Sequence, residues 1–132
     1  MDVKKYIKVQ DLDIYKLARE LSKIGWEIYS LLNWQDKKTM GDQFIRATDS
    51  FGANITEGYS RYYYLDKIRF FYNSRASLSE ANDYWLEVMH ERKKVEDKLC
   101  GQYKNIAVKC SIKLQNFIST NYKSRNIANI NK

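Results

Sequence analysis

The stretch IYKLARELSKIGWEIYSL, residues 14–31, carries the pattern that decides the fold. Its apolar residues recur at alternating steps of three and four, which places them along one side of an α-helix for about five turns. They are Ile14, Leu17, Leu21, Ile24, Ile28 and Leu31. The pattern predicts a first helix over residues 11–32, with Asp11 as its N-cap and a turn over residues 33–38.

Three further segments show the same helical period. The apolar face of the second is Met40, Phe44, Ala47, Phe51 and Ile55. We expect this helix to end with Gly58 in the left-handed C′ position. The face of the third is Ile68, Phe71, Leu78, Trp85 and Met89, with the small Ser74 and Ala81 between them. After a charged turn over residues 91–98, the face of the fourth is Leu99, Tyr103, Ile106, Cys110, Leu114 and Phe117.

The sequence contains no proline that would break these helices. Four helices of similar length with short connections bury their apolar stripes best in an up-down-up-down arrangement. The sequence therefore predicts an all-α four-helix bundle in a single domain over residues 1–120. Residues 121–132 are polar and basic, and we expect a frayed or disordered tail there.

The charge is distributed unevenly along the chain. The formal net charge is +7, and residues 1–97 hold sixteen Lys and Arg against sixteen Asp and Glu. Residues 98–132 hold seven Lys and Arg and no acid, so they carry the whole excess. Such asymmetry indicates an anionic partner.

Several classes of function lack their sequence signals. No apolar run is long enough for a membrane span and no signal peptide is apparent, so we expect a cytoplasmic protein with no membrane partner. The only histidine, His90, forms one Glu-x-x-His pair with Glu87, which is too few ligands for a di-iron site. Cys100 and Cys110 are expected to be buried and reduced. We therefore expect no metal, no cofactor, no catalytic residue and no enzyme activity.

A polar strip borders the apolar stripes of the second and third helices. Its members are Gln43, Arg46, Ser50, Asn54, Glu57, Ser77 and Glu80. We interpret it as a hydrogen-bonded network that fixes the register of two antiparallel helices, because unsatisfied polar groups at a helix seam are costly. The alternative is a catalytic pair of carboxylates, Glu57 and Glu80.

Two basic regions are candidate nucleic-acid contacts. The hairpin between the second and third helices combines Arg61, Lys67, Arg69 and Arg75 with Tyr62, Tyr63 and Tyr64. Cationic groups pair with phosphates and tyrosine rings stack on bases, but tyrosines also suit the end of a bundle or a subunit contact. The fourth helix projects Lys98, Lys109 and Lys113 to one side, which predicts a basic stripe for a polyanion.

The stretch QFIRATDSFGANITEGYSR, residues 43–61, resembles the helix-two signature of the 23S rRNA intervening sequence proteins, once called ribosomal protein S23. The motif reads Q-(L/I)-x-R-A-x-x-S-(I/V)-x-x-N-I-A-E-G-x-x-R. This sequence keeps its spacing at Gln43, Arg46, Ala47, Ser50, Asn54, Ile55, Glu57, Gly58 and Arg61. The resemblance extends from residue 9 through the helix-three stretch FFYNSRASLSEANDYWL, residues 70–86.

The resemblance implies a bacterial, left-handed four-helix bundle that assembles as a homopentamer and has no established enzyme activity. The related accessory proteins of diversity-generating retroelements bind nucleic acid and a reverse transcriptase through the same bundle. We therefore expect a non-enzymatic homo-oligomer that binds RNA or DNA through its basic surfaces. The alternative is a protein-interaction scaffold or accessory subunit, with a partner such as a reverse transcriptase and no nucleic-acid contact of its own.

Overall fold

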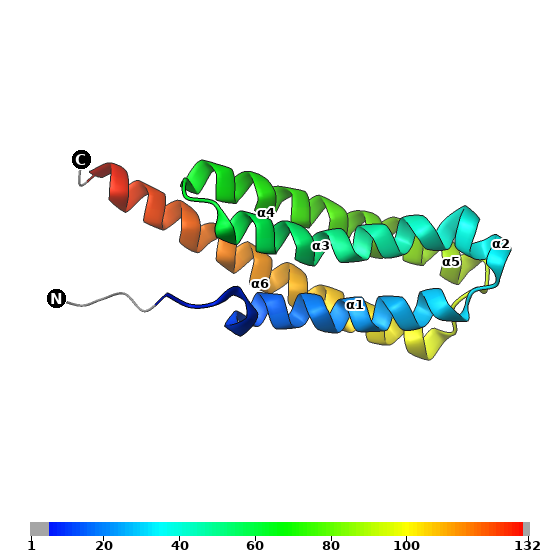
Figure 1. Cartoon of the computed structure of the whole chain (residues 1–132). Helices are drawn as coiled ribbons and strands as arrows, with labels where there is room; N and C mark the ends of the chain where they lie inside the picture. Colours follow the sequence, from blue (N-terminus) through cyan, green and yellow to red (C-terminus); the bar gives the residue numbers. More distant parts are fainter. Residues whose placement is uncertain (1–5, 131–132) are drawn as a thin grey trace.

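A computed structural model describes residues 6–130 of the chain, and the side chains of residues 6–127 (Figure 1). The described part is helical and contains no strand. Its four long rods are built from the following elements. The first is α1 (Asp13–Leu31), preceded by the short 3₁₀ turn η1 (Val9–Asp11). The second is α2 (Trp34–Asp36), the π-helical η2 (Lys37–Gly41) and α3 (Asp42–Ser60). The third is α4 (Tyr64–Ser79), the π-helical η3 (Glu80–Trp85) and α5 (Leu86–Glu91). The fourth is α6 (Asp97–Ile130).

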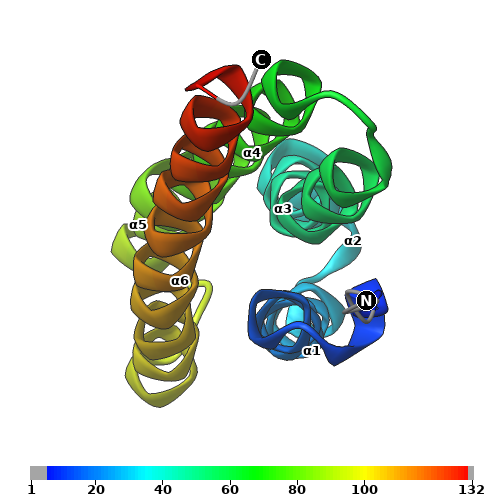
Figure 2. The same cartoon turned by 90° about the vertical axis from the view of Figure 1, so that its left-hand side faces the viewer.

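The rods form a closed cycle of neighbours. Helix α1 packs on α3, α3 on α4, α4 on α6, and α6 on α1 (Figure 2). Consecutive rods run in opposite directions, so that the hairpin between α3 and α4 lies at the same end as the last turns of α6 (Figure 1). The predicted all-α four-helix bundle is thus confirmed.

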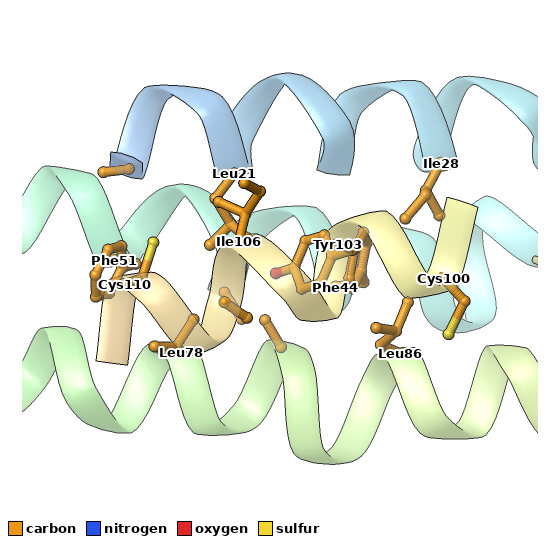
Figure 3. Packing of buried hydrophobic residues seen from close by; sticks show 14 of the residues in the cluster. Leu21, Ile28, Phe44, Phe51, Leu78, Leu86, Cys100, Tyr103, Ile106 and Cys110 are labelled. Atoms are coloured by element: carbon orange, nitrogen blue, oxygen red, sulfur yellow. The ribbon is translucent and has the colours of Figure 1, made fainter. Parts of the chain in front are cut away.

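Large apolar side chains from all four rods fill the centre (Figure 3). Phe44, Phe51, Phe71 and Tyr103 are fully buried. The ring centroids of Phe44 and Tyr103 lie 5.1 Å apart, within the range of favourable tilted aromatic pairs. The buried Tyr103 hydroxyl is 2.7 Å from Thr48 Oγ1, so the polar tip of this tyrosine has a partner inside the core.

The buried face of α1 is shifted relative to the predicted stripe. Ile14, Leu21 and Ile28 are buried as predicted, but Leu31 is 70% exposed. The helix instead buries the small residues Ala18 and Gly25, and Leu32 just after its end. A Cβ atom added at Gly25 would lie 2.9 Å from Thr48 Cγ2 of α3, so the absence of a side chain there lets the two helices approach.

Two predicted boundaries of this region are wrong. Asp11 lies in η1, and the N-cap of α1 is Leu12, which makes no side-chain cap. The predicted turn over residues 33–38 is mostly helix. There the Asn33 side chain accepts a hydrogen bond from the Asp36 N–H at 2.8 Å and caps a new helix directly.

Gly58 does not end its helix, contrary to the prediction. Helix α3 continues to Ser60, and no described glycine has a positive φ. A glycine is needed there because α3 and α4 are very close: an added Cβ would lie 2.8 Å from both Phe70 Cβ and Phe71 Cε1 of α4. Gly58 therefore sets the distance between α3 and α4 at the base of their hairpin.

The third rod contains an extra residue that the periodic pattern missed. Its buried positions run Phe71, Ser74, Leu78 and Ala81, but the next is Leu86 and not Trp85. The step of five from Ala81 to Leu86 falls in η3, where π-helical winding accommodates one more residue per turn. As a result Trp85 is only half-buried at the edge of the core, and its indole N–H donates to Glu80 Oε2 at 3.0 Å.

The last helix is longer than predicted. Helix α6 continues through Ile130, so residues 121–130 are helical and the expected frayed or disordered tail is not what the structure shows there. Residues 131 and 132 of that predicted tail lie outside the described residues. The charged turn before α6 is present, between the end of α5 at Glu91 and Asp97.

Candidate nucleic-acid interface

One end of the bundle gathers tyrosine and basic side chains from two distant parts of the sequence. The hairpin between α3 and α4 and the C-terminal turns of α6 meet there (Figures 1 and 2). The hydroxyls of Tyr72 and Tyr122 lie 2.9 Å apart and join the two segments. We call this region the tyrosine-arginine end. It comprises Arg61, Tyr62, Tyr63, Lys67, Arg69, Tyr72, Arg75, Tyr122, Lys123 and Arg125.

The helical period explains why α4 and α6 present these groups together. Arg69, Tyr72 and Arg75 lie on successive turns of α4, since residues three apart are neighbours on a helix. The Arg75 guanidinium lies 4.7 Å from the centre of the Tyr72 ring. Tyr122 and Arg125 are likewise three residues apart, on α6.

Two arginines act electrostatically on the Tyr122 hydroxyl. Its pKa is raised from the ordinary value, first by the hydrogen bond with Tyr72 and then by burial. The positive charges of Arg125 and Arg75 act in the opposite direction and lower that pKa. The crossing of α4 and α6 therefore combines two hydroxyls with the positive charges of two guanidinium groups, a combination that suits an anionic oxygen.

The apex of the hairpin presents two open tyrosine rings. Tyr62 is 86% exposed and Tyr63 67% exposed, and their centroids lie 5.0 Å apart in an edge-to-face arrangement. Tyr64, which the sequence placed with them, is half-buried. The backbone on both sides is fixed, because the Arg61 N–H donates to the Gly58 carbonyl at 3.1 Å and the Lys67 N–H donates to the Tyr63 carbonyl at 3.0 Å.

The predicted hairpin cations differ in what they contact. Lys67 is half-buried, its Nζ donates to the Tyr59 carbonyl at 2.8 Å, and burial lowers its pKa. This bond from Lys67 to Tyr59 links the two sides of the hairpin. The Arg61 guanidinium lies 4.8 Å from the Phe70 ring centre and is 2.5 Å from Glu57 Oε1. Arg69 and Arg75 are exposed, and their charges face solvent at this end.

The basic stripe predicted along the fourth helix does not stay free of acids. Lys113 Nζ lies 3.7 Å from Asp13 Oδ2 of α1. Lys109 and Lys113 border a groove of about 410 Å³ between α1 and α6, which Asp13 and Glu20 also line. Lys98 is exposed at the start of α6, far along the helix from Tyr122. The structure therefore separates these three lysines from the tyrosine-arginine end and supplies carboxylates beside two of them.

The predicted polar network between the second and third helices is wrong in its geometry. Gln43, Arg46, Glu57 and Glu80 are exposed, while Ser50, Asn54 and Ser77 are half-buried. Their hydrogen bonds stay within one rod: Asn54 Nδ2 donates to the Ser50 carbonyl at 2.8 Å, and Glu57 and Glu80 accept from Arg61 and Trp85. Helices are instead joined by Ser22 with Asp49, Tyr29 with Asp42, and the buried Ser74 with the Phe51 carbonyl.

The side chains that could serve metal or acid-base chemistry have other partners. His90 Nε2 lies 2.7 Å from Asp97 Oδ1, and Glu87 pairs with Lys104. Within residues 6–127, no group of three or more histidine, cysteine, aspartate or glutamate side chains is placed to hold a metal ion. Cys100 and Cys110 are both buried free thiols.

The tyrosine-arginine end also contains residues that the sequence did not single out. Tyr122, Lys123 and Arg125 fall in the segment that was expected to be a disordered tail. Their signal was the three-residue spacing of Tyr122 and Arg125, which repeats the spacing of Tyr72 and Arg75. That spacing is informative only if the segment is helical, as it is in α6.

These features define a class: an all-α four-helix bundle whose distinctive surface is a basic, tyrosine-rich end. No helix in the described part of the chain has an apolar stretch long enough to cross a membrane. The family described as "23S rRNA-intervening sequence protein" matches residues 10–116, and the chain belongs to this family. Tyr122, Lys123 and Arg125 lie beyond the matched residues.

A solved structure supports the same fold. It is a protein of unknown function from the S23 ribosomal protein family of Bacteroides thetaiotaomicron VPI-5482. The two chains are 23% identical, and the match covers 80% of this chain and 97% of the other with a TM-score of 0.74. No curated protein matches the sequence.

Proposed function

We propose that this chain is a non-enzymatic, homo-oligomeric protein that binds RNA or DNA at the tyrosine-arginine end. The observation that carries the proposal is the meeting of α4 and α6 through Tyr72 and Tyr122. It combines two segments, residues 58–75 and 117–127, that together contain six Lys and Arg residues and one carboxylate, Asp66, while Glu57 just before them pairs with Arg61. Guanidinium groups recognise phosphate oxygens through paired hydrogen bonds, and phosphates are the repeating charge of nucleic acids.

Two triple variants can show whether nucleic acid binds at the tyrosine-arginine end or along the basic stripe, because each region offers three cations. Replacing Arg69, Arg75 and Arg125 by Glu is expected to weaken binding of a labelled structured RNA or single-stranded DNA at least about tenfold. The matched control replaces Lys98, Lys109 and Lys113 by Glu. It changes the net charge by the same amount, and it is expected to weaken binding much less because these lysines lie outside the proposed site.

Fluorescence anisotropy at about 50 and 200 mM salt gives both the affinity and its salt dependence. The wild-type chain should show a steep loss of affinity with salt that survives competition with tRNA. The arginine variant should show a slope smaller by about one for each phosphate that it no longer neutralises. Equal weakening by both variants would mean that only net charge matters, and the proposed site would be wrong. The mass under non-denaturing conditions measures the oligomer, for which the family resemblance favours five subunits.

A second candidate function is a scaffold that contacts a partner protein, such as a reverse transcriptase. One observation favours it: Trp26, Leu31 and Trp34, towards the opposite end of the bundle, are 59%, 70% and 71% exposed. Exposed aromatic side chains of this size are typical of protein interfaces. A partner that is retained after nuclease treatment, and lost in Trp34→Ala, would support this function.

A further inference from the structure

The two open rings at the hairpin apex, Tyr62 and Tyr63, lie outside the buried core. Other aromatic side chains of the hairpin pack inward: Phe71 lies 4.8 Å from the Phe117 ring centre, and Tyr59 faces the same ring at 6.4 Å. Tyr62 and Tyr63 instead pair with one another and are largely exposed. The hairpin is already closed by the backbone bonds at Gly58 and Tyr63 and by the Lys67 ammonium group on the Tyr59 carbonyl.

The rings are nevertheless held on a rigid frame. Tyr63 is the N-cap residue of α4, with its carbonyl bonded to the Lys67 N–H. Four residues before Tyr62, Gly58 packs closely against Phe70 and Phe71. Binding on such a frame loses little backbone entropy, because the hairpin is ordered before a ligand arrives.

The geometry of the pair leaves aromatic faces accessible. In an edge-to-face pair, one ring presents its edge to a face of the other, so each ring keeps at least one open face. The 86% and 67% exposures agree with this. An aromatic face accepts a flat base by stacking, and such stacking depends little on sequence.

From this geometry we infer that the tyrosine-arginine end binds single-stranded nucleic acid, with unpaired bases stacked on Tyr62 and Tyr63. The inference rests on the proposed function and adds the kind of strand. In a duplex the base faces are covered by neighbouring base pairs, so the two rings would have nothing to stack on. Phosphates of the same strand would lie near Arg69 and Arg75, which follow on α4. A cationic surface beside open rings favours a nucleic acid over an apolar segment of protein.

The test compares a single strand of about 12 nucleotides with a duplex of the same length, at one salt concentration. The wild-type chain is expected to prefer the single strand. Tyr62→Ala and Tyr63→Ala should each weaken single-strand binding about tenfold, and should leave duplex affinity and the salt slope unchanged because tyrosine is uncharged. Tyr62→Phe and Tyr63→Phe should retain the affinity, since they keep the ring. Trp34→Ala is the matched control for loss of an exposed aromatic ring elsewhere.

Failure of this inference is distinguishable from failure of the proposed function. If the alanine variants bind the single strand as tightly as wild type, while the Arg69, Arg75 and Arg125 variant still loses binding, the stacking role is wrong and the basic site stands. Equal wild-type affinity for both strand types would overturn the stacking role in the same way. A changed native mass in the alanine variants, with strand affinity intact, would show that the rings form a subunit contact. Absence of binding to either strand by wild type would overturn both proposals.

Discussion

Two groups that are buried in their neutral forms, Cys110 and Tyr103, are together expected to lower the free energy of unfolding by about 4 kcal/mol between pH 8 and pH 11. Burial raises the pKa of the Cys110 thiol from its ordinary 9.0 to about 12. Burial also raises the pKa of Tyr103 well above its ordinary 10.0, although the hydrogen bond with Thr48 partly offsets this. Both side chains are fully buried in the core.

The direction of this effect follows from proton binding. Above pH about 9 an unfolded Cys110 loses its proton while the folded one keeps it, and the same holds for Tyr103 above pH about 10. The stability that each group contributes is therefore fully present below its unfolded-state pKa, and above that pH it falls by about 1.4 kcal/mol per pH unit until the folded-state pKa is reached.

Urea unfolding at several pH values measures this loss, and Cys110→Val provides the control. Valine cannot ionise, so between pH 9 and 11 the free energy of unfolding of this variant should fall less steeply than that of wild type, by up to about 1.4 kcal/mol per pH unit. Comparison with wild type removes the common effect of lysine deprotonation. An identical pH dependence in the two proteins would contradict the assignment to Cys110.

Gly58→Ala is expected to destabilise the protein by about 1 to 3 kcal/mol, although alanine is the better helix former. The new Cβ would lie 2.8 Å from Phe70 Cβ and Phe71 Cε1 and 3.1 Å from the Lys67 carbonyl oxygen. The backbone oxygen cannot rotate away, so α3 and α4 must separate at the base of the hairpin. Binding to single strands should weaken as well, because this contact positions the start of α4.

Gly101→Ala is the matched control for Gly58→Ala. Gly101 is an exposed glycine inside α6, and an added Cβ there meets nothing within 4 Å. Only the helix propensity changes, so this variant should gain up to about 1 kcal/mol. Thermal or urea unfolding of the two variants should give shifts of opposite sign. Two stabilising substitutions would show that the contact at Gly58 relaxes without cost.

The periodic pattern was sufficient to predict the helices but not their exact faces. Hydrophobic spacing located each of the four rods, because a helix that buries one side must repeat apolar residues at that period. The spacing of large apolar residues could not show that small residues would be buried. In α1 the contact with α3 is made by Ala18 and Gly25, and Leu31 therefore faces outward. The prediction also assumed regular winding, and η3 breaks that assumption between Ala81 and Leu86.

The sequence predicted many residues of the candidate site but not which segments of the chain come together to form it. The sequence indicated the hairpin arginines and tyrosines from composition alone, and the charge excess after residue 97 was visible. The sequence did not reveal that these C-terminal cations fall into two groups, one beside α1 and one beside α4. Lys113 lies beside a carboxylate of α1, whereas Tyr122, further along the same helix, pairs with Tyr72 of α4. Such partners come from segments distant in the chain, which no local spacing encodes.

The widened turn of η3 also bears on how the chain can vary in length. Removing one residue from most positions of a helix rotates everything beyond it by about 100° and carries the core face out of register. In η3 the step from Ala81 to Leu86 is already one residue too long for an α-helix. Loss of a single residue between them would restore ordinary winding and keep Leu86 and Met89 facing inward, so relatives one residue shorter at this point can retain the same core.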